Sequence, residues 1–151
     1  MQPLANMALR AARKAGQIIV RALDRVDRVN AEQKGKNDWV SDIDRAAEAA
    51  IIETLLTAYP DHGFLGEESG HREGHDGHTT WIIDPLDGTT NFLRGIPHFA
   101  ISIACRQHGR LEHAVVFDPL RDEAFVASRG YGAQLNGKRL RVTRLPSLDR
   151  S

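Results

Sequence analysis

Apolar residues near the start of the chain recur at the three- and four-residue spacing that is typical of an amphipathic helix. The repeat runs through Leu4, Met7, Ala8, Ala11, Ala12, Ala15, Ile18, Ile19 and Ala22. Arginine and lysine occupy positions between them, so one face is apolar and the other is charged. This pattern predicts a helix over residues 3–23, with Pro3 in the first turn, where its missing N–H has no structural cost.

A second helical repeat follows and is carried by Ile43, Ala47, Ala50, Ile51, Leu55 and Leu56. It predicts a helix over residues 42–59, which begins at the capping signal Ser41-Asp42 and ends before Pro60. The charged segment 24–38 contains Gly and Asn, so we expect it to be mainly a mobile connection. Trp39-Val40 is then expected to be a short extended piece.

From residue 63 onward, short apolar runs are separated by Gly, Pro, Asn and Asp, which is typical of strands and turns. We expect a strand leading into a loop over 63–69, a surface loop over 70–80, and strands at about 81–84, 97–105, 111–117 and 123–127. Asn136-Gly137 predicts a hairpin between 133–135 and 139–142. This order predicts an α+β fold in one domain over residues 1–151, with two N-terminal helices packed on an antiparallel β-sheet.

Composition adds little and excludes several classes. The 20 basic and 20 acidic side chains cancel, so total charge does not indicate nucleic acid or an anionic membrane as an obligate partner. The single cysteine, Cys105, excludes an internal disulfide, which fits a reducing compartment. No apolar stretch approaches the roughly 20 residues that span a bilayer, and the N-terminus lacks a signal-peptide pattern. We therefore expect a cytoplasmic protein.

Candidate chemistry is concentrated in residues 81–92 (WIIDPLDGTTNF), which begin as a buried strand. Adjacent side chains on a strand diverge, so Asp84 and Asp87 can converge only if the chain turns between them. Pro85 and Gly88 permit that turn. The residues after Gly88 suit a helix start, whose free N–H groups favour an anion. Carboxylates would repel that anion without an intervening cation, so the segment predicts a magnesium-assisted phosphate site.

Glu67 and Glu68 strengthen this interpretation. Alone, Asp84-x-x-Asp87 is typical of a structural Asx turn, and a Glu pair is usually solvated. However, strands around residues 65 and 83 can be neighbours, which would gather three carboxylates at one end of the sheet. Packing them there without a hard divalent cation would cost several kcal/mol in repulsion and desolvation.

Three other patterns are weaker. Residues 132–138 match most of a P-loop, but Arg139 stands where Ser or Thr should hold magnesium, and the hairpin is favoured. His71, His75 and His78 have a spacing compatible with zinc, although so polar a loop favours solvated side chains. The Asp-x-x-Asp-Gly-Thr run is similar to a motif of haloacid-dehalogenase-like phosphatases, which have one residue between the carboxylates instead of two.

Gly66-Glu-Glu-Ser69 followed by residues 81–92 resembles the inositol monophosphatase family, in particular its bacterial SuhB-type branch. The resemblance extends over the whole chain, including residues 35–44 and the Asn136-Gly137 hairpin. It implies the first half of the layered αβαβα fold that this family shares with fructose-1,6-bisphosphatase. The family's second half, which would supply a further aspartate ligand and most contacts to the substrate hydroxyls, is expected to be absent from these 151 residues.

The resemblance also implies roles for the carboxylates. One Mg²⁺ would be held by Glu67, Asp84 and the carbonyl of Leu86. A second would be held by Asp84 and Asp87. Glu68 would lie next to these ligands without binding a metal itself. Asp84 would bridge the two ions.

Further implied roles concern water and phosphate. Thr89, hydrogen-bonded to Asp44, would orient the attacking water together with Glu67. The N–H groups of Gly88 and Thr89 would receive the phosphate next to Asp87. Lys34 would lie on a mobile loop that closes over the metals.

The implied activity is magnesium-dependent hydrolysis of a phosphate monoester, with inositol 1-phosphate as the first substrate candidate and a homodimer as the usual assembly. The alternative is a non-catalytic regulatory protein that binds transcription or RNA machinery, or an inactive fragment.

Overall fold

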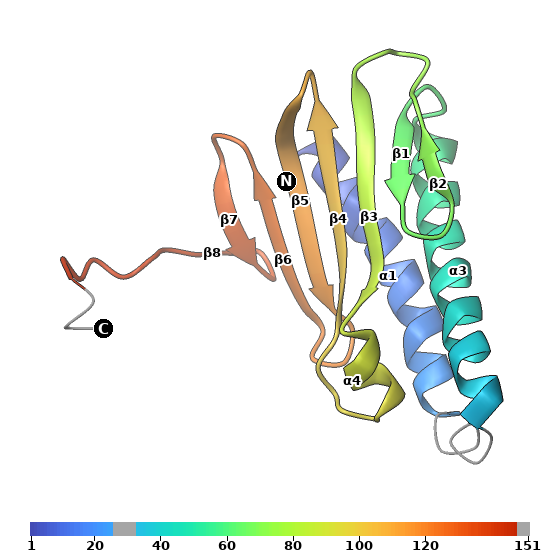
Figure 1. Cartoon of the computed structure of the whole chain (residues 1–151). Coiled ribbons are helices and arrows are strands. Elements are labelled where there is room, and N and C mark those ends of the chain that lie inside the picture. Colours follow the sequence, from blue (N-terminus) through green and yellow to red (C-terminus); the bar gives the residue numbers. More distant parts are fainter. Residues whose placement is uncertain (26–32, 148–151) are drawn as a thin grey trace.

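The computed structural model describes residues 1–25 and 33–147, without the side chains at positions 33, 34, 36 and 37 (Figure 1). Two long helices, α1 (Pro3–Leu23) and α3 (Gln33–Ala58), lie against one face of a single sheet. A short helix, α4 (Thr89–Leu93), lies at one end of it. Two helices on a sheet confirm the predicted α+β class.

Helix α1 has the bounds that its periodicity predicted. Its inner face consists largely of alanines, all of them buried: Ala5, Ala8, Ala11, Ala12 and Ala15. Such small side chains let the helix approach the sheet closely, and a Cβ at Gly16 would lie 2.9 Å from Cε2 of Phe117 on the sheet. The helix therefore packs on β4, β5 and β6 as well as on α3.

Helix α3 corrects the prediction for residues 33–41, because it begins at Gln33 rather than at Asp42. Residues 26–32 of the expected connection lie outside the described residues. Trp39 and Val40 are helical instead of extended, and Ser41-Asp42 lies inside the helix. Val40 is buried at the same spacing as Ile43, and the Trp39 ring stacks 5.7 Å from the ring of Phe92. Tertiary packing of these apolar residues thus overrides the helix-breaking tendency of the Gly and Asn before them.

The sheet has eight described strands in the order β2-β1-β3-β4-β5-β6-β7-β8. In chain order they are β1 (Gly63–Gly66), β2 (Gly70–Arg72), β3 (Thr79–Asp87), β4 (Ala100–Gln107), β5 (Arg110–Asp118), β6 (Glu123–Ser128), β7 (Gly132–Leu135) and β8 (Lys138–Arg139). The pairing is antiparallel except between β1 and β3, which are parallel. Strand β2 and the first two residues of β3 lie within the predicted surface loop 70–80, so that loop prediction was wrong at both ends.

The core lies between the helices and one face of the sheet. Trp81, Ile101, Ile103 and Val115 are fully buried on that face. The opposite face, turned toward the viewer in Figure 1, carries no helix from the described residues, and Val116 and Phe125 are exposed there. None of the described helices has a stretch long and apolar enough to cross a membrane.

The Asn136-Gly137 turn joins β7 to β8 and confirms the predicted hairpin. Both residues have positive φ, 50° and 82°, which is the backbone conformation that an Asn-Gly two-residue turn requires. Asn136 also accepts a hydrogen bond from the N–H of Ala124 on β6. Strand β8 is shorter than expected, since it ends at Arg139.

Candidate functional site

The predicted turn between Asp84 and Asp87 is a β-bulge at the end of β3. Asp84 pairs with Ser102 and Asp87 pairs with Ala100, so β3 carries one extra residue between the two carboxylates. The N–H of Leu86 donates to Oδ1 of Asp84 at 3.3 Å, which is an Asx-type turn. Burial, followed by the charge of Asp87, raises the pKa of Asp84. The two carboxylates are therefore close enough to repel each other.

Glu67 reaches the same end of the sheet through the parallel pairing of β1 with β3. That pairing ends with Gly66 opposite Ile83, so Glu67 leaves β1 beside Asp84. Burial, followed by the charge of Asp84, raises the pKa of Glu67. The sequence-based expectation that strands near residues 65 and 83 are neighbours is confirmed.

Asp44 approaches this group from α3. Its residue is only 7% exposed, and its Oδ1 is buried without a hydrogen-bond partner among the described residues. Burial, followed by the charges of Glu67, Glu68 and Asp84, raises the pKa of Asp44 to about 7. Buried polar atoms normally have a hydrogen-bond partner, so this Oδ1 is an exception.

Glu48, one helical turn after Asp44, is a member of the group that sequence reasoning missed. Its residue is fully buried, and its carboxylate accepts hydrogen bonds from the N–H groups of Glu68 and Ser69. Its position in the sequence could have indicated this role. Glu48 lies on the same helical face as Ile51 and Leu55, where an apolar residue is expected.

Gly88 and Thr89 begin helix α4 directly after the bulge. Gly88 has φ 95°, and a Cβ there would lie 2.9 Å from the carbonyl oxygen of His98, so no other residue fits without strain. The Thr89 hydroxyl donates to the carbonyl of Leu86 at 3.1 Å and not to Asp44, so the expected Thr89–Asp44 hydrogen bond is not formed. Lys34 falls on α3, but its side chain lies outside the described residues.

Six carboxylates thus gather where β1, β3 and α3 meet, and they belong to Asp44, Glu48, Glu67, Glu68, Asp84 and Asp87. Among the described ion pairs only one reaches this group, between Arg45 and Glu68 at 3.5 Å. Within the described part of the chain, no three His, Cys, Asp or Glu side chains already converge tightly enough to hold a metal. The donor set still fits a hard divalent cation, because it consists of oxygens, carries excess negative charge and includes an unpartnered buried oxygen.

The other predicted metal site receives no support from the structure. His78 stacks on His108 with ring centroids 4.2 Å apart, and its Nδ1 lies 2.9 Å from the carbonyl oxygen of Asp76. No metal-binding group that includes His71 or His75 exists among the described residues. The zinc alternative is therefore set aside.

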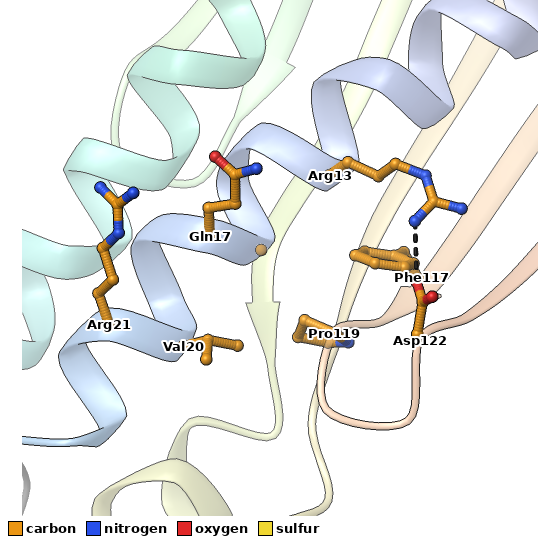
Figure 2. A pocket seen from close by; sticks show the side chains of 8 residues that line it. Arg13, Gln17, Val20, Arg21, Phe117, Pro119 and Asp122 are labelled. Atoms are coloured by element: carbon orange, nitrogen blue, oxygen red, sulfur yellow. Dashed lines mark hydrogen bonds and ion pairs between the residues drawn. The ribbon is translucent and has the colours of Figure 1, made fainter.

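A pocket of about 370 Å³ lies away from the carboxylates, between α1 and the segment after β5 (Figure 2). Arg13 lies 5.0 Å above the Phe117 ring and forms a 2.8 Å ion pair with Asp122. Val20 and Pro119 complete its apolar lining. The pocket contains none of the predicted site residues, so the candidate site remains the acidic end of the sheet.

Comparison with known proteins gives consistent results. A model of the inositol monophosphatase family matches residues 1–151. The chain is 56% identical over 151 residues to a Pseudomonas aeruginosa protein named Nus factor SuhB, covering 99% of this chain and 56% of that protein.

Among solved structures, extragenic suppressor protein SuhB from Bartonella henselae is similar with a TM-score of 0.84 and 42% identity, over 95% of this chain and 56% of that one. Inositol monophosphatase from Anabaena sp. PCC 7120 is similar with a TM-score of 0.78 and 33% identity, over 93% of this chain and 49% of that one. The chain therefore spans about half the length of the relatives it matches.

Proposed function

The chain belongs to the inositol monophosphatase family, and from this membership and its acidic site we propose that it is the metal-binding half of a magnesium-dependent phosphomonoesterase. The observation that carries the proposal is the buried oxygen of Asp44, which has no hydrogen-bond partner among the described residues and lies among carboxylates whose charges raise the pKa of Asp44. Such a group is costly in isolation and is stabilised by a cation.

In this proposal Glu67, Asp84 and Asp87 offer carboxylate oxygens to Mg²⁺, and Leu86 offers its carbonyl. That carbonyl already accepts one hydrogen bond from Thr89 and has a second lone pair available. When bound, magnesium would lower the pKa of a water molecule and neutralise charge on the leaving oxygen. Asp44 would accept a proton or a hydrogen bond from that water, because its Oδ1 has no competing partner among the described residues.

The phosphate end of the site is assigned to the N–H groups of Gly88 and Thr89, which follow the bulge. A phosphomonoester placed there lies next to the carboxylates of Asp84 and Asp87, so hydrolysis needs the cation to offset their repulsion. Inositol 1-phosphate is the proposed substrate, on the basis of the family. We also propose a homodimer, on the same basis.

The test is phosphate release from inositol 1-phosphate with and without Mg²⁺, for the wild type and for Asp84→Asn. The matched control is Asp61→Asn, the same change at an exposed position outside the site. Magnesium-dependent release that only Asp84→Asn abolishes supports the proposal. If both variants release phosphate like the wild type, the assignment of Asp84 is wrong. If no protein releases phosphate, Mg²⁺ binding by calorimetry becomes the deciding measurement, and equal binding by wild type and Asp84→Asn would refute the site.

A second candidate function is binding to transcription machinery without catalysis. It is favoured by one observation, the name Nus factor carried by the Pseudomonas aeruginosa relative. The two functions separate in one experiment, because Asp84→Asn should abolish a phosphatase but leave binding to RNA polymerase and its associated factors unchanged. Retained binding by a chain that releases no phosphate with any magnesium concentration would favour this second function.

A further inference from the structure

We propose that Glu48 is a positioning residue that fixes the turn carrying Glu67 and thereby sets the affinity of the site for magnesium. The inference rests on the proposed function for its link to the metal, whereas the positioning itself rests on contacts within the chain. Glu48 makes no ligand contact in this proposal and acts through the backbone of residues 67–69.

The turn in question joins β1 to β2 and consists of Glu67, Glu68 and Ser69. The Glu48 carboxylate accepts from the N–H of Glu68 at 3.1 and 3.3 Å and from the N–H of Ser69 at 2.6 Å. Hydrogen bonds to an ionised acceptor are stronger than those between neutral groups. One buried side chain of α3 therefore satisfies two successive amides of a loop that has no strand partner of its own.

The absence of a side chain at Gly66 makes room for this contact. A Cβ at Gly66 would overlap Oε1 of Glu48 and lie 2.6 Å from its Cδ, so the carboxylate occupies the space that any other residue would need. Glycine at this position thus leaves room for the Glu48 carboxylate against the turn, although the backbone of Gly66 lies in an ordinary strand.

The consequence for Glu67 follows from its neighbours on both sides. Gly66 is held by its pairing with Ile83 on β3, and the N–H of Glu68 is held by Glu48. Glu67 lies between these two fixed points, so its Cα–Cβ direction toward Asp84 is determined by them. Without Glu48, only the strand side would remain fixed.

A carboxylate is needed here rather than an amide. Glutamine would offer one oxygen to the two amides, and its NH₂ group would face a donor. The buried charge of Glu48 is itself costly, and no cation of the described ion pairs contacts it. Retaining this charge at 0% exposure is consistent with a role in orienting the loop.

The test compares Glu48→Gln with Glu53→Gln, the same change at an exposed position on α3. In the metal-free proteins we measure amide hydrogen exchange at Glu68 and Ser69, and we titrate each protein with Mg²⁺ by calorimetry. We expect Glu48→Gln to speed exchange at both amides by about tenfold and to weaken Mg²⁺ binding by about 10- to 100-fold, as for other residues that orient metal ligands. Glu53→Gln should change neither quantity.

Gly66→Ala separates positioning from charge, because it keeps the Glu48 charge but displaces the carboxylate from the turn. Protection of the two amides should fall in this variant, since the carboxylate no longer accepts from them. If Glu48 acts by positioning, Mg²⁺ affinity falls as well, whereas an effect of charge alone leaves the affinity unchanged. Unaltered exchange in Glu48→Gln would overturn the proposal. A wild type that binds no Mg²⁺ but shows Glu48-dependent protection would refute the proposed metal site while supporting the anchoring role of Glu48.

Discussion

Replacing Asp44 by asparagine should stabilise the metal-free protein at neutral pH and leave it unchanged in acid. Burial and the neighbouring charges of Glu67 and Glu68 raise the pKa of Asp44 to about 7, from an ordinary value of 3.8. Between those two pH values the folded protein retains a proton that the unfolded chain has lost. The free energy of unfolding therefore falls as pH rises from about 4 to about 7, and the full penalty applies above that range.

The size of the effect follows from the two pKa values. At about 1.4 kcal/mol for each tenfold change in the proton equilibrium, the interval from 3.8 to about 7 corresponds to on the order of 4 kcal/mol. This is a large fraction of the roughly 5–15 kcal/mol that stabilises an ordinary domain. Asparagine is nearly isosteric with aspartate and carries no charge, so it escapes the penalty at every pH.

The assay is urea unfolding of wild type and Asp44→Asn over a pH series from about 4 to about 8 without divalent cations. The difference between the two proteins measures the loss of the Asp44 charge together with its repulsion by Glu67 and Asp84, whose own raised pKa values act in the same direction in both proteins. Asp61→Asn serves as the exposed control. Saturating Mg²⁺ should stabilise the wild type at about pH 8 and shrink the difference, because a bound cation favours the ionised carboxylates. A variant that is less stable than the wild type at about pH 8 without metal would refute this reasoning.

Two further predictions concern stability. Burial lowers the pKa of His62, whose Nδ1 accepts a hydrogen bond from Nε1–H of Trp81. The unfolded chain therefore binds a proton more readily than the folded protein, and the free energy of unfolding should fall as pH falls below about 6.5. His62→Gln should weaken that dependence in urea unfolding. A wild type with the same acid profile as the variant would contradict this. Gly88→Ala should destabilise the protein by about 1–3 kcal/mol in the same assay, through its φ of 95° and the close carbonyl of His98. Gly109→Ala, which has positive φ but open space, should cost less, and equal losses would show that crowding at Gly88 is unimportant.

The sequence alone determined the elements that depend on local rules. The period of small apolar residues determined helix α1 to its ends, because a 3.6-residue repeat has one structural solution over so many turns. Asn136-Gly137 determined its hairpin through backbone conformation. The Asp-Pro-Leu-Asp run determined that the chain turns between its carboxylates, and the resemblance of residues 66–92 indicated the family. The roles assigned to single residues in catalysis remain predictions.

Tertiary structure decided what depends on packing between distant segments. Helix α3 extends back to Gln33, where Trp39 stacks on Phe92. Phe92 is distant in the sequence, so local helix propensity does not include this contact. The parallel pairing of β1 with β3 decided that Glu67 meets Asp84, since register between strands is a long-range property. Glu48 could not be identified as a site residue for the same reason, since in the sequence it is one polar position on a helix. Its carboxylate contacts the amides of Glu68 and Ser69 only because α3 packs against the β1–β2 turn.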